Sequence, residues 1–166
     1  YANLSPVIVS ALAHSGAFDR AEAGYVFSSN MLGTALGGLC IIFFVRRLNW
    51  RRTAVALLIA LILLDLLSAV AHSPPALYLL RFAHGLTGGG LIGVMMSVIA
   101  RTLNPERTIA LFIMLQLLVG GVLAIVLTPL LLSLGTQIVW LSLFGFTLLG
   151  LLLLPLLDPY PIEIRQ

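Results

Sequence analysis

The feature that most constrains this chain is a series of long apolar stretches separated by short polar segments. Five of them have about the length of a membrane span: Tyr25–Val45, Thr53–Ala71, Phe82–Ala100, Thr108–Leu132 and Ile138–Leu157. A helix that crosses a bilayer needs about 20 apolar residues. Because lipid offers the backbone no hydrogen-bond partners, only helices and closed barrels can span it. These stretches are continuous and Leu-rich, without the alternation of barrel strands. The sequence therefore predicts an all-α, multi-spanning helical bundle.

The scarcity of charge excludes several classes of protein. Only 9% of the residues are charged, whereas about a quarter are charged in ordinary soluble domains. A soluble enzyme, a disordered tail and a disulfide-stapled secreted domain are therefore excluded. Cys40 is the only cysteine, so an intramolecular disulfide and a cysteine metal cluster are excluded too. We expect no metal, no cofactor and no nucleic-acid partner, because the arginines separate apolar runs instead of forming a basic stripe.

The two ends of the chain indicate a single membrane domain. Tyr1–Ala13 is apolar but too short to cross a bilayer, which predicts a fragment that starts within its first spanning helix. Residues 1–166 are then expected to form one transmembrane domain of about six helices. Residues 158–166 are polar and broken by proline, which predicts the start of a cytoplasmic linker. The connections are short, so consecutive helices are expected to be antiparallel neighbours.

Three polar segments predict where helices begin. Asp19 and Glu22 have the spacing of a capping box, in which each side chain accepts a hydrogen bond from the backbone N–H of the other residue. Ser73 precedes two prolines and Asn104 precedes one, and proline is favoured at the first helical position. We therefore expect the second, fourth and fifth helices to open at these points.

The arginines are distributed asymmetrically between the two sides of the predicted bundle. One side has only Arg20, beside two acidic residues, and the other side has seven arginines. Basic residues favour the cytoplasmic side of a membrane. The sequence therefore predicts a multi-pass protein of the cell (inner) membrane with cytoplasmic basic loops, and Trp50 and Trp140 as interfacial anchors. The seven are Arg46, Arg47, Arg51 and Arg52 in one loop, which we expect to bind acidic groups of lipid or of another helix, and Arg101, Arg107 and Arg165.

Three stretches resemble motifs of the major facilitator superfamily. Glu22–Gly38 is similar to the second helix of that family, Arg46–Arg52 occupies the place of its cytoplasmic loop motif, and Leu80–Gly90 resembles its fourth-helix motif. The resemblance covers nearly the whole chain, as the N-terminal six-helix half of such a transporter. The loop departs from the family pattern, since Arg46 stands at its Asp position. The fifth helix lacks the Gly-Pro signature of drug–proton antiporters, so drug export is not favoured.

The resemblance implies a function and a missing partner. The expected function is secondary active transport of a small solute by alternating access. The solute site would then require a second six-helix half, from a further part of the polypeptide or from a partner chain. Six spans can form two inverted sets of three, the inverted repeat of many secondary transporters. Asn30–Leu36 matches Gln116–Val122 loosely, and each stretch places one amide in an apolar run.

Polar side chains within the predicted spans are candidates for a solute cavity. Asn30 and Thr34 form a polar pair on the second helix, and Gln116 is expected near the midplane, where secondary transporters bind substrate. Each could instead make an interhelical hydrogen bond. His84 lies one turn from Arg81 and could relay protons, or it could be a buried packing residue.

Asp65 and Arg81 are the only charged residues well inside the spans. Counting 1.5 Å per residue from the helix ends puts both about 8–9 Å below the outer edge of the membrane. A charge at the centre of a membrane helix costs about 2.5–3.5 kcal/mol on insertion scales, so an intramembrane ion pair is expected. The alternative, implied by the fourth-helix resemblance, is that Arg81 turns to the cavity and binds an anionic substrate or a proton-carrying acid.

Glycines recur every four residues on two of the predicted helices. They are Gly33 and Gly37 on the second helix, and Gly85, Gly89 and Gly93 on the fourth. This spacing places them on one face of each helix, where a neighbouring backbone can approach closely. We expect these faces to pack helices together, and a smooth face would also permit sliding between conformers.

Two other classes of function fit the pattern less well. An intramembrane enzyme needs a nucleophile with a base, paired carboxylates or a metal cluster. Asp65 is the only carboxylate within a span, and no Gly-x-Ser-x-Gly or His-Glu-x-x-His motif occurs. A non-transporting scaffold or subunit would need only the glycine faces. Convergence of Asn30, Thr34, Arg81 and Gln116 on one cavity would favour transport over a scaffold.

Overall fold

The protein is a bundle of helices, as the apolar stretches predict. The computed structural model describes residues 5–14, 18–44, 47–71, 73–134 and 137–157, and within these ranges it contains helices and turns but no strand. Five of the helices are long and apolar enough to cross a membrane. The all-α fold class is therefore confirmed. The elements are α1 (Ser5–His14), α2 (Arg20–Phe44), α3 (Trp50–Val70), α4 (Pro74–Ile99), α5 (Pro105–Leu134), α6 (Gln137–Leu153) and a short 3-10 turn, η2 (Leu154–Leu156).

The helices begin at the polar segments that the sequence indicates. The Asp19 N–H donates to Glu22 Oε2 at 3.0 Å, and the Glu22 N–H donates to Asp19 Oδ1 at 2.6 Å. This reciprocal pair is a capping box and satisfies two backbone donors at the start of α2. Prolines stand at the first positions of α4 and α5. In addition, Asn49 caps α3 by accepting a hydrogen bond from the Arg52 N–H at 3.2 Å.

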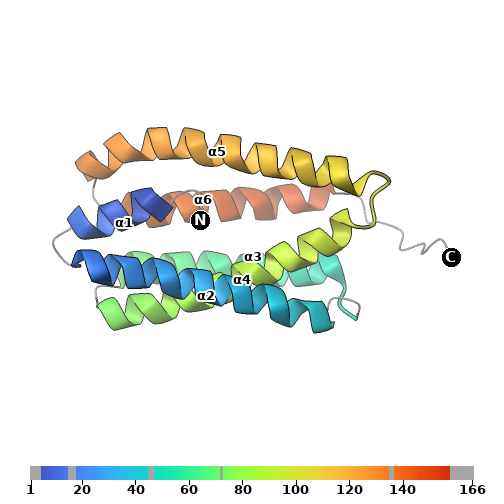
Figure 1. The fold of residues 1–166 in the computed structure, drawn as a ribbon, viewed down its shortest axis with the longest axis horizontal. Helices are drawn as coiled ribbons and strands as arrows, with labels where there is room; N and C mark the ends of the chain where they lie inside the picture. Colours follow the sequence, from blue (N-terminus) through green and yellow to red (C-terminus); the bar gives the residue numbers. More distant parts are fainter. Residues whose placement is uncertain (1–4, 15–17, 45–46, 72, 135–136, 158–166) are drawn as a thin grey trace.

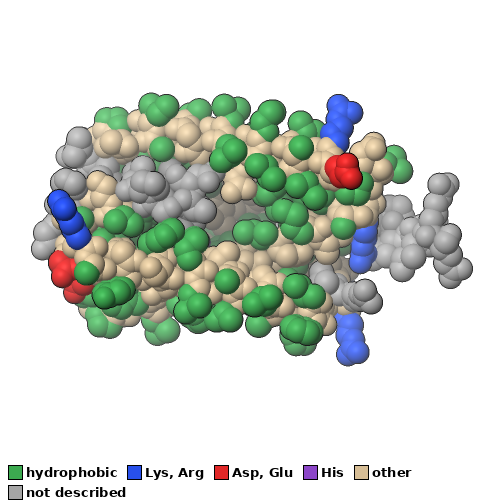
Figure 2. Space-filling model, viewed as in Figure 1, with side chains coloured by type: hydrophobic (Ala, Val, Ile, Leu, Met, Phe, Trp, Pro, Cys, Tyr) green, Lys and Arg blue, Asp and Glu red, His purple; other side chains and the backbone are tan. Residues whose placement is uncertain are grey.

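The helices form two layers that run along the long axis of the molecule (Figure 1). One layer contains α2, α3 and α4, and the other contains α1, α5 and α6. The layers meet where α3 packs against α6 and where α1 packs against α2. Apolar side chains cover the outer surface (Figure 2), including Phe43 on α2 and Ile125 on α5. A surface of this kind suits lipid and not water.

The most extensive packing joins α2 to α4, and this corrects one expectation. Short connections predicted that consecutive helices are neighbours, but α2 makes little contact with α3, the next helix along the chain. Instead α4 packs against both α2 and α3. The physical reason is that α2 and α4 present complementary glycine faces, and close backbone contact along both helices outweighs adjacency in the chain.

The glycine faces interlock on both sides of the α2–α4 contact. A Cβ atom added at Gly33 or Gly37 would overlap the main chain of α4, and one added at Gly85 or Gly89 would overlap the main chain of α2. The carbonyl groups concerned belong to Phe82, Leu86, Asn30 and Thr34, respectively. Gly93 differs because its added Cβ would meet the side chain of Ile41. The first four positions therefore require glycine, whereas a side chain could move aside at the fifth.

We predict that Gly89→Ala destabilises the bundle by about 1–3 kcal/mol, because the main chain at Thr34 would have to shift. The matched control is Gly121→Ala, since an added Cβ there meets open space. In the middle of a helix that substitution should be neutral or stabilise by up to about 1 kcal/mol. Reversible unfolding in mixed micelles measures both effects. Equal unfolding free energies for the two variants would contradict the close-packing argument.

Candidate functional site

A fully buried ion pair lies where α3 and α4 meet. Arg81 NH2 lies 3.1 Å from Asp65 Oδ1, and neither side chain has exposed surface. The same guanidinium nitrogen donates to the backbone carbonyl of Leu64 at 3.3 Å and to the hydroxyl of Ser68. Ser68 follows Asp65 by one turn, and its hydroxyl also donates to the Leu64 carbonyl. The sequence analysis missed Ser68, although its three-residue spacing from Asp65 puts both on one face of α3.

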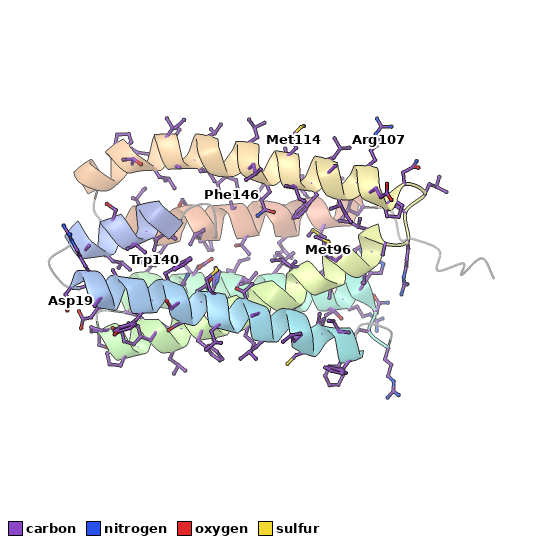
Figure 3. The ribbon with its side chains drawn as sticks, viewed as in Figure 1. Asp19, Met96, Arg107, Met114, Trp140 and Phe146 are labelled. Carbon is purple, nitrogen blue, oxygen red and sulfur yellow. The ribbon has the colours of Figure 1, made fainter. Side chains whose placement is uncertain are left out.

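Trp140, which belongs to α6, packs its side chain against the charged pair. The Arg81 guanidinium carbon lies 4.5 Å from the centroid of the Trp140 ring, which is a cation–π contact. Trp140 is buried, and Figure 3 shows it between α6 and the layer below it. The expectation that Trp140 is an interfacial anchor is therefore wrong. Trp140 lies near the start of its apolar run, and this position does not indicate that its ring faces an arginine on another helix.

His84 and Asn30 extend this network to α2. Asn30 Nδ2 lies 2.9 Å from the Arg81 carbonyl oxygen and 3.1 Å from His84 Nδ1. A carbonyl oxygen can only accept, so the amide nitrogen of Asn30 must be the donor in both contacts. His84 Nδ1 therefore accepts, and Nε2 carries the hydrogen. Nε2 lies 3.3 Å from Asp65 Oδ1, which accepts from it. The hydrogen bonds thus define one neutral tautomer of His84.

The buried network has no net charge. The carboxylate of Asp65 is balanced by the guanidinium of Arg81, and His84 is neutral in the tautomer described above. Its members come from four helices, α2, α3, α4 and α6. A buried ion pair is tolerated only when hydrogen bonds replace the water that each group loses, and this network supplies several of them.

A cavity of about 340 Å³ lies beside the network. Six of the residues that line it are polar, and they come from five helices, α2 to α6. Arg81 does not line the cavity; it lies behind Asp65 and His84. Of the four residues whose convergence would favour transport, three meet at this cavity. The polar lining residues, with the network's Asp65, are Asn30, Thr34, Asp65, His84, Gln116 and Thr147, and apolar ones include Met31, Leu58, Leu61, Leu91, Ile92, Leu143 and Phe146.

The basic loop lies at one end of the bundle, and the acidic capping box lies at the other (Figures 1 and 3). The described arginines of the loop are Arg47, Arg51 and Arg52, and Arg46 lies outside the described residues. Arg51 NH2 donates to the Pro155 carbonyl at 3.2 Å. This bond ties the start of α3 to the end of α6. Blue side chains at the same end in Figure 2 show that the basic groups gather there.

A bundle of membrane-length helices around a partly polar cavity is the architecture of a membrane transport protein. The family model of the Major Facilitator Superfamily matches residues 1–165, and the chain belongs to that family. The protein is therefore a multi-pass membrane transporter and not an enzyme, as the resemblance implied. Comparison with curated proteins and comparison with solved structures each gave no match.

We predict that the contributions of Asp65 and Arg81 to the free energy of unfolding are strongly coupled. Asp65→Asn or Arg81→Gln alone should cost about 3–5 kcal/mol, because either change leaves the other charge buried without its partner. The double variant should recover most of that loss. The yield of folded protein and the unfolding free energy in mixed micelles, measured for all four members of the cycle, test this. Additive losses in the double variant would show that the two charges do not stabilise each other.

Proposed function

We propose that this chain is part of a secondary active transporter that moves a small solute by alternating access. The observation that carries the proposal is the cavity, because polar side chains from α2, α4, α5 and α6 line it within an otherwise apolar bundle. A polar group in hydrocarbon is costly unless it pairs with another or faces a polar pathway. Membership of the Major Facilitator Superfamily supports the same conclusion.

The depth of the cavity supports this role. Gln116 lies eleven residues after Pro105, the first residue of α5, or about 16 Å along the helix at 1.5 Å per residue. Half the thickness of a bilayer's hydrocarbon core is about 15 Å. Secondary transporters bind their substrates near this level, between structural repeats. We therefore place the solute between Gln116 on one side and Asn30, Thr34 and His84 on the other.

A second six-helix unit would complete the cavity. On this proposal, residues 1–166 form one transmembrane domain, residues 158–166 begin the cytoplasmic linker, and the second unit belongs to a further part of the polypeptide or to a partner chain. The exposed apolar surface of α5 supports this, since only 6% of its span is buried in the bundle. Lipid covers the remaining apolar surface.

A non-transporting scaffold is the alternative. The interlocked glycines of α2 and α4 would serve a scaffold equally well. A scaffold, however, has no need of a cavity of about 340 Å³ to which three separated segments contribute amide and hydroxyl groups. The cavity is the observation that favours transport.

The orientation follows from the distribution of arginine. We propose that the protein lies in the cell (inner) membrane and that the end with Arg47, Arg51, Arg52, Arg101 and Arg107 faces the cytoplasm, since basic loops favour that side. Anionic lipid at the cytoplasmic surface would then contribute about 1 kcal/mol per arginine near it.

Alternating access predicts that a cavity residue is reached by water from both sides of the membrane. In the complete transporter with Cys40→Ser, we expect Thr147→Cys to react with a membrane-impermeant thiol reagent added from either side. Ile59→Cys is the control, because Ile59 is an exposed apolar residue outside the cavity and lies nine residues after Trp50, or about 14 Å along α3 at 1.5 Å per residue. It should react from neither side. Reaction of Thr147→Cys from one side only would argue against alternating access.

The loop arginines are predicted to set the orientation of the chain. Replacing Arg46, Arg47, Arg51 and Arg52 with Gln removes about 4 kcal/mol of attraction to an anionic surface, at about 1 kcal/mol each. We expect a mixture of orientations, measured by labelling of the α2–α3 connection from each side. Arg20→Gln, at the opposite end, is the control and should leave the orientation unchanged. A fully retained orientation in the fourfold variant would refute the topological role.

A further inference from the structure

The side chains that line the cavity have given most of their hydrogen-bond donors to the protein itself. Thr34 Oγ1 donates to the Asn30 carbonyl at 2.9 Å, and Thr147 Oγ1 donates to the Leu143 carbonyl at 3.0 Å. Both contacts that Asn30 Nδ2 makes are donated ones, to the Arg81 carbonyl and to His84 Nδ1. His84 in turn donates to Asp65 through Nε2.

The guanidinium of Arg81, the strongest donor near the cavity, belongs to the buried network and does not line the cavity. The NH2 group of Arg81 donates to Asp65, to the Leu64 carbonyl and to Ser68, while the guanidinium packs on Trp140. The side chain has no exposed surface. Asp65 and His84 line the cavity and Arg81 does not, so a carboxylate or phosphate entering it would meet those two side chains before this guanidinium. Arg81 thus holds Asp65, which lines the cavity, but does not line the cavity itself.

The polar side chains that line the cavity can still accept hydrogen bonds. A hydroxyl that has donated its hydrogen still has lone pairs, so Thr34 and Thr147 can each accept. Asn30, with its amide nitrogen used, has only its oxygen to offer. Asp65 lines the cavity, and its Oδ2 atom is buried with no hydrogen-bond partner in the described part of the chain. A buried carboxylate oxygen without a donor is costly, and an N–H or O–H group brought by a ligand would satisfy it.

The rest of the wall is apolar. Leucines of α3, α4 and α6, with Phe146 of α6, make up much of the lining. Such a surface gains free energy by covering the apolar part of a ligand, roughly in proportion to the area removed from water. The cavity thus combines an apolar surface with a group of acceptors around Asp65.

We infer that the cavity selects a small solute with an apolar body and an N–H or O–H donor, and that it rejects anions. This inference rests on the proposed function and names its substrate class. The solute is an amine or an alcohol: both present donors to the acceptor-rich wall. A carboxylate of the same shape brings no donor at neutral pH and adds a negative charge beside Asp65, so it binds weakly.

Four probes with the same cyclohexyl body test this inference. Cyclohexylmethylamine and cyclohexylmethanol carry donors, methoxycyclohexane carries only an acceptor, and cyclohexanecarboxylate carries a negative charge. Binding to the chain in lipid nanodiscs is followed through the NMR signals of labelled threonine methyl groups. We expect both donor probes to perturb the Thr34 and Thr147 signals saturably. The ether and the carboxylate should bind at least tenfold more weakly, and the comparison of amine with alcohol shows whether a positive charge adds affinity.

Isosteric variants test whether the threonines that line the cavity contribute to binding of the probes. Thr34→Val and Thr147→Val keep the shape and remove an acceptor, so each should weaken the donor probes by about three- to tenfold, the range expected for one hydrogen bond. The remaining threonine in each variant reports the binding. Thr128→Val is the control, since Thr128 lies outside the cavity, and it should leave every affinity unchanged.

The outcomes separate this inference from the function on which it rests. If the carboxylate or the ether binds as tightly as the alcohol, the substrate class is wrong, while solute binding in the cavity stands. Donor probes that bind equally well to Thr34→Val, Thr147→Val and Thr128→Val would also overturn the class. If none of the four probes perturbs the cavity threonines saturably, both the inference and the proposed solute cavity fail.

Discussion

A carboxylate and a guanidinium buried in a membrane bundle must neutralise each other, and this requirement organises the interior of the protein. Asp65 and Arg81 are 3.1 Å apart with no exposed surface. Leaving water costs each ion several kcal/mol, and attraction alone offsets that cost only when hydrogen bonds complete the pair. Ser68, His84 and Trp140 supply hydrogen bonds and a cation–π contact. Satisfying one ion pair therefore draws α3, α4 and α6 together around it.

The glycine faces of α2 and α4 allow the second helix to join this network. Gly85 lies against the carbonyl of Asn30, so close that no side chain could stand between them. This proximity lets Asn30 reach the Arg81 carbonyl and His84 Nδ1 with one short side chain. A larger residue at Gly85 would move the two backbones apart and lengthen both hydrogen bonds. Packing and polar chemistry are therefore coupled at this contact, because the small residues set the distance at which the amide acts.

Sequence patterns predict those parts of the structure that depend on local rules. Apolar length predicts the spans, the capping box predicts the start of α2, and helix geometry places Asp65 and Arg81 at one depth. The neighbour relations of the helices depend on long-range packing, so the pairing of α2 with α4 instead of α3 was not predicted. The same holds for Trp140, whose partner lies on another helix. Whether Arg81 faces the cavity or lies behind it depends on contacts from three other helices, which no local pattern contains.

The unequal packing of the helices bears on how the cavity could change shape. Within its membrane span, 33% of α4 is buried in the bundle, compared with 6% of α5. The wall that carries Asn30, Thr34 and His84 is held by close backbone contact and by the charged network. The wall that carries Gln116 belongs to α5, which has few contacts within the bundle. Displacing α5 therefore costs less packing energy than separating α2 from α4, because less apolar surface is uncovered. On the proposed function, a cavity between one rigid and one weakly held wall would open at Gln116 while the network around Asp65 stays intact.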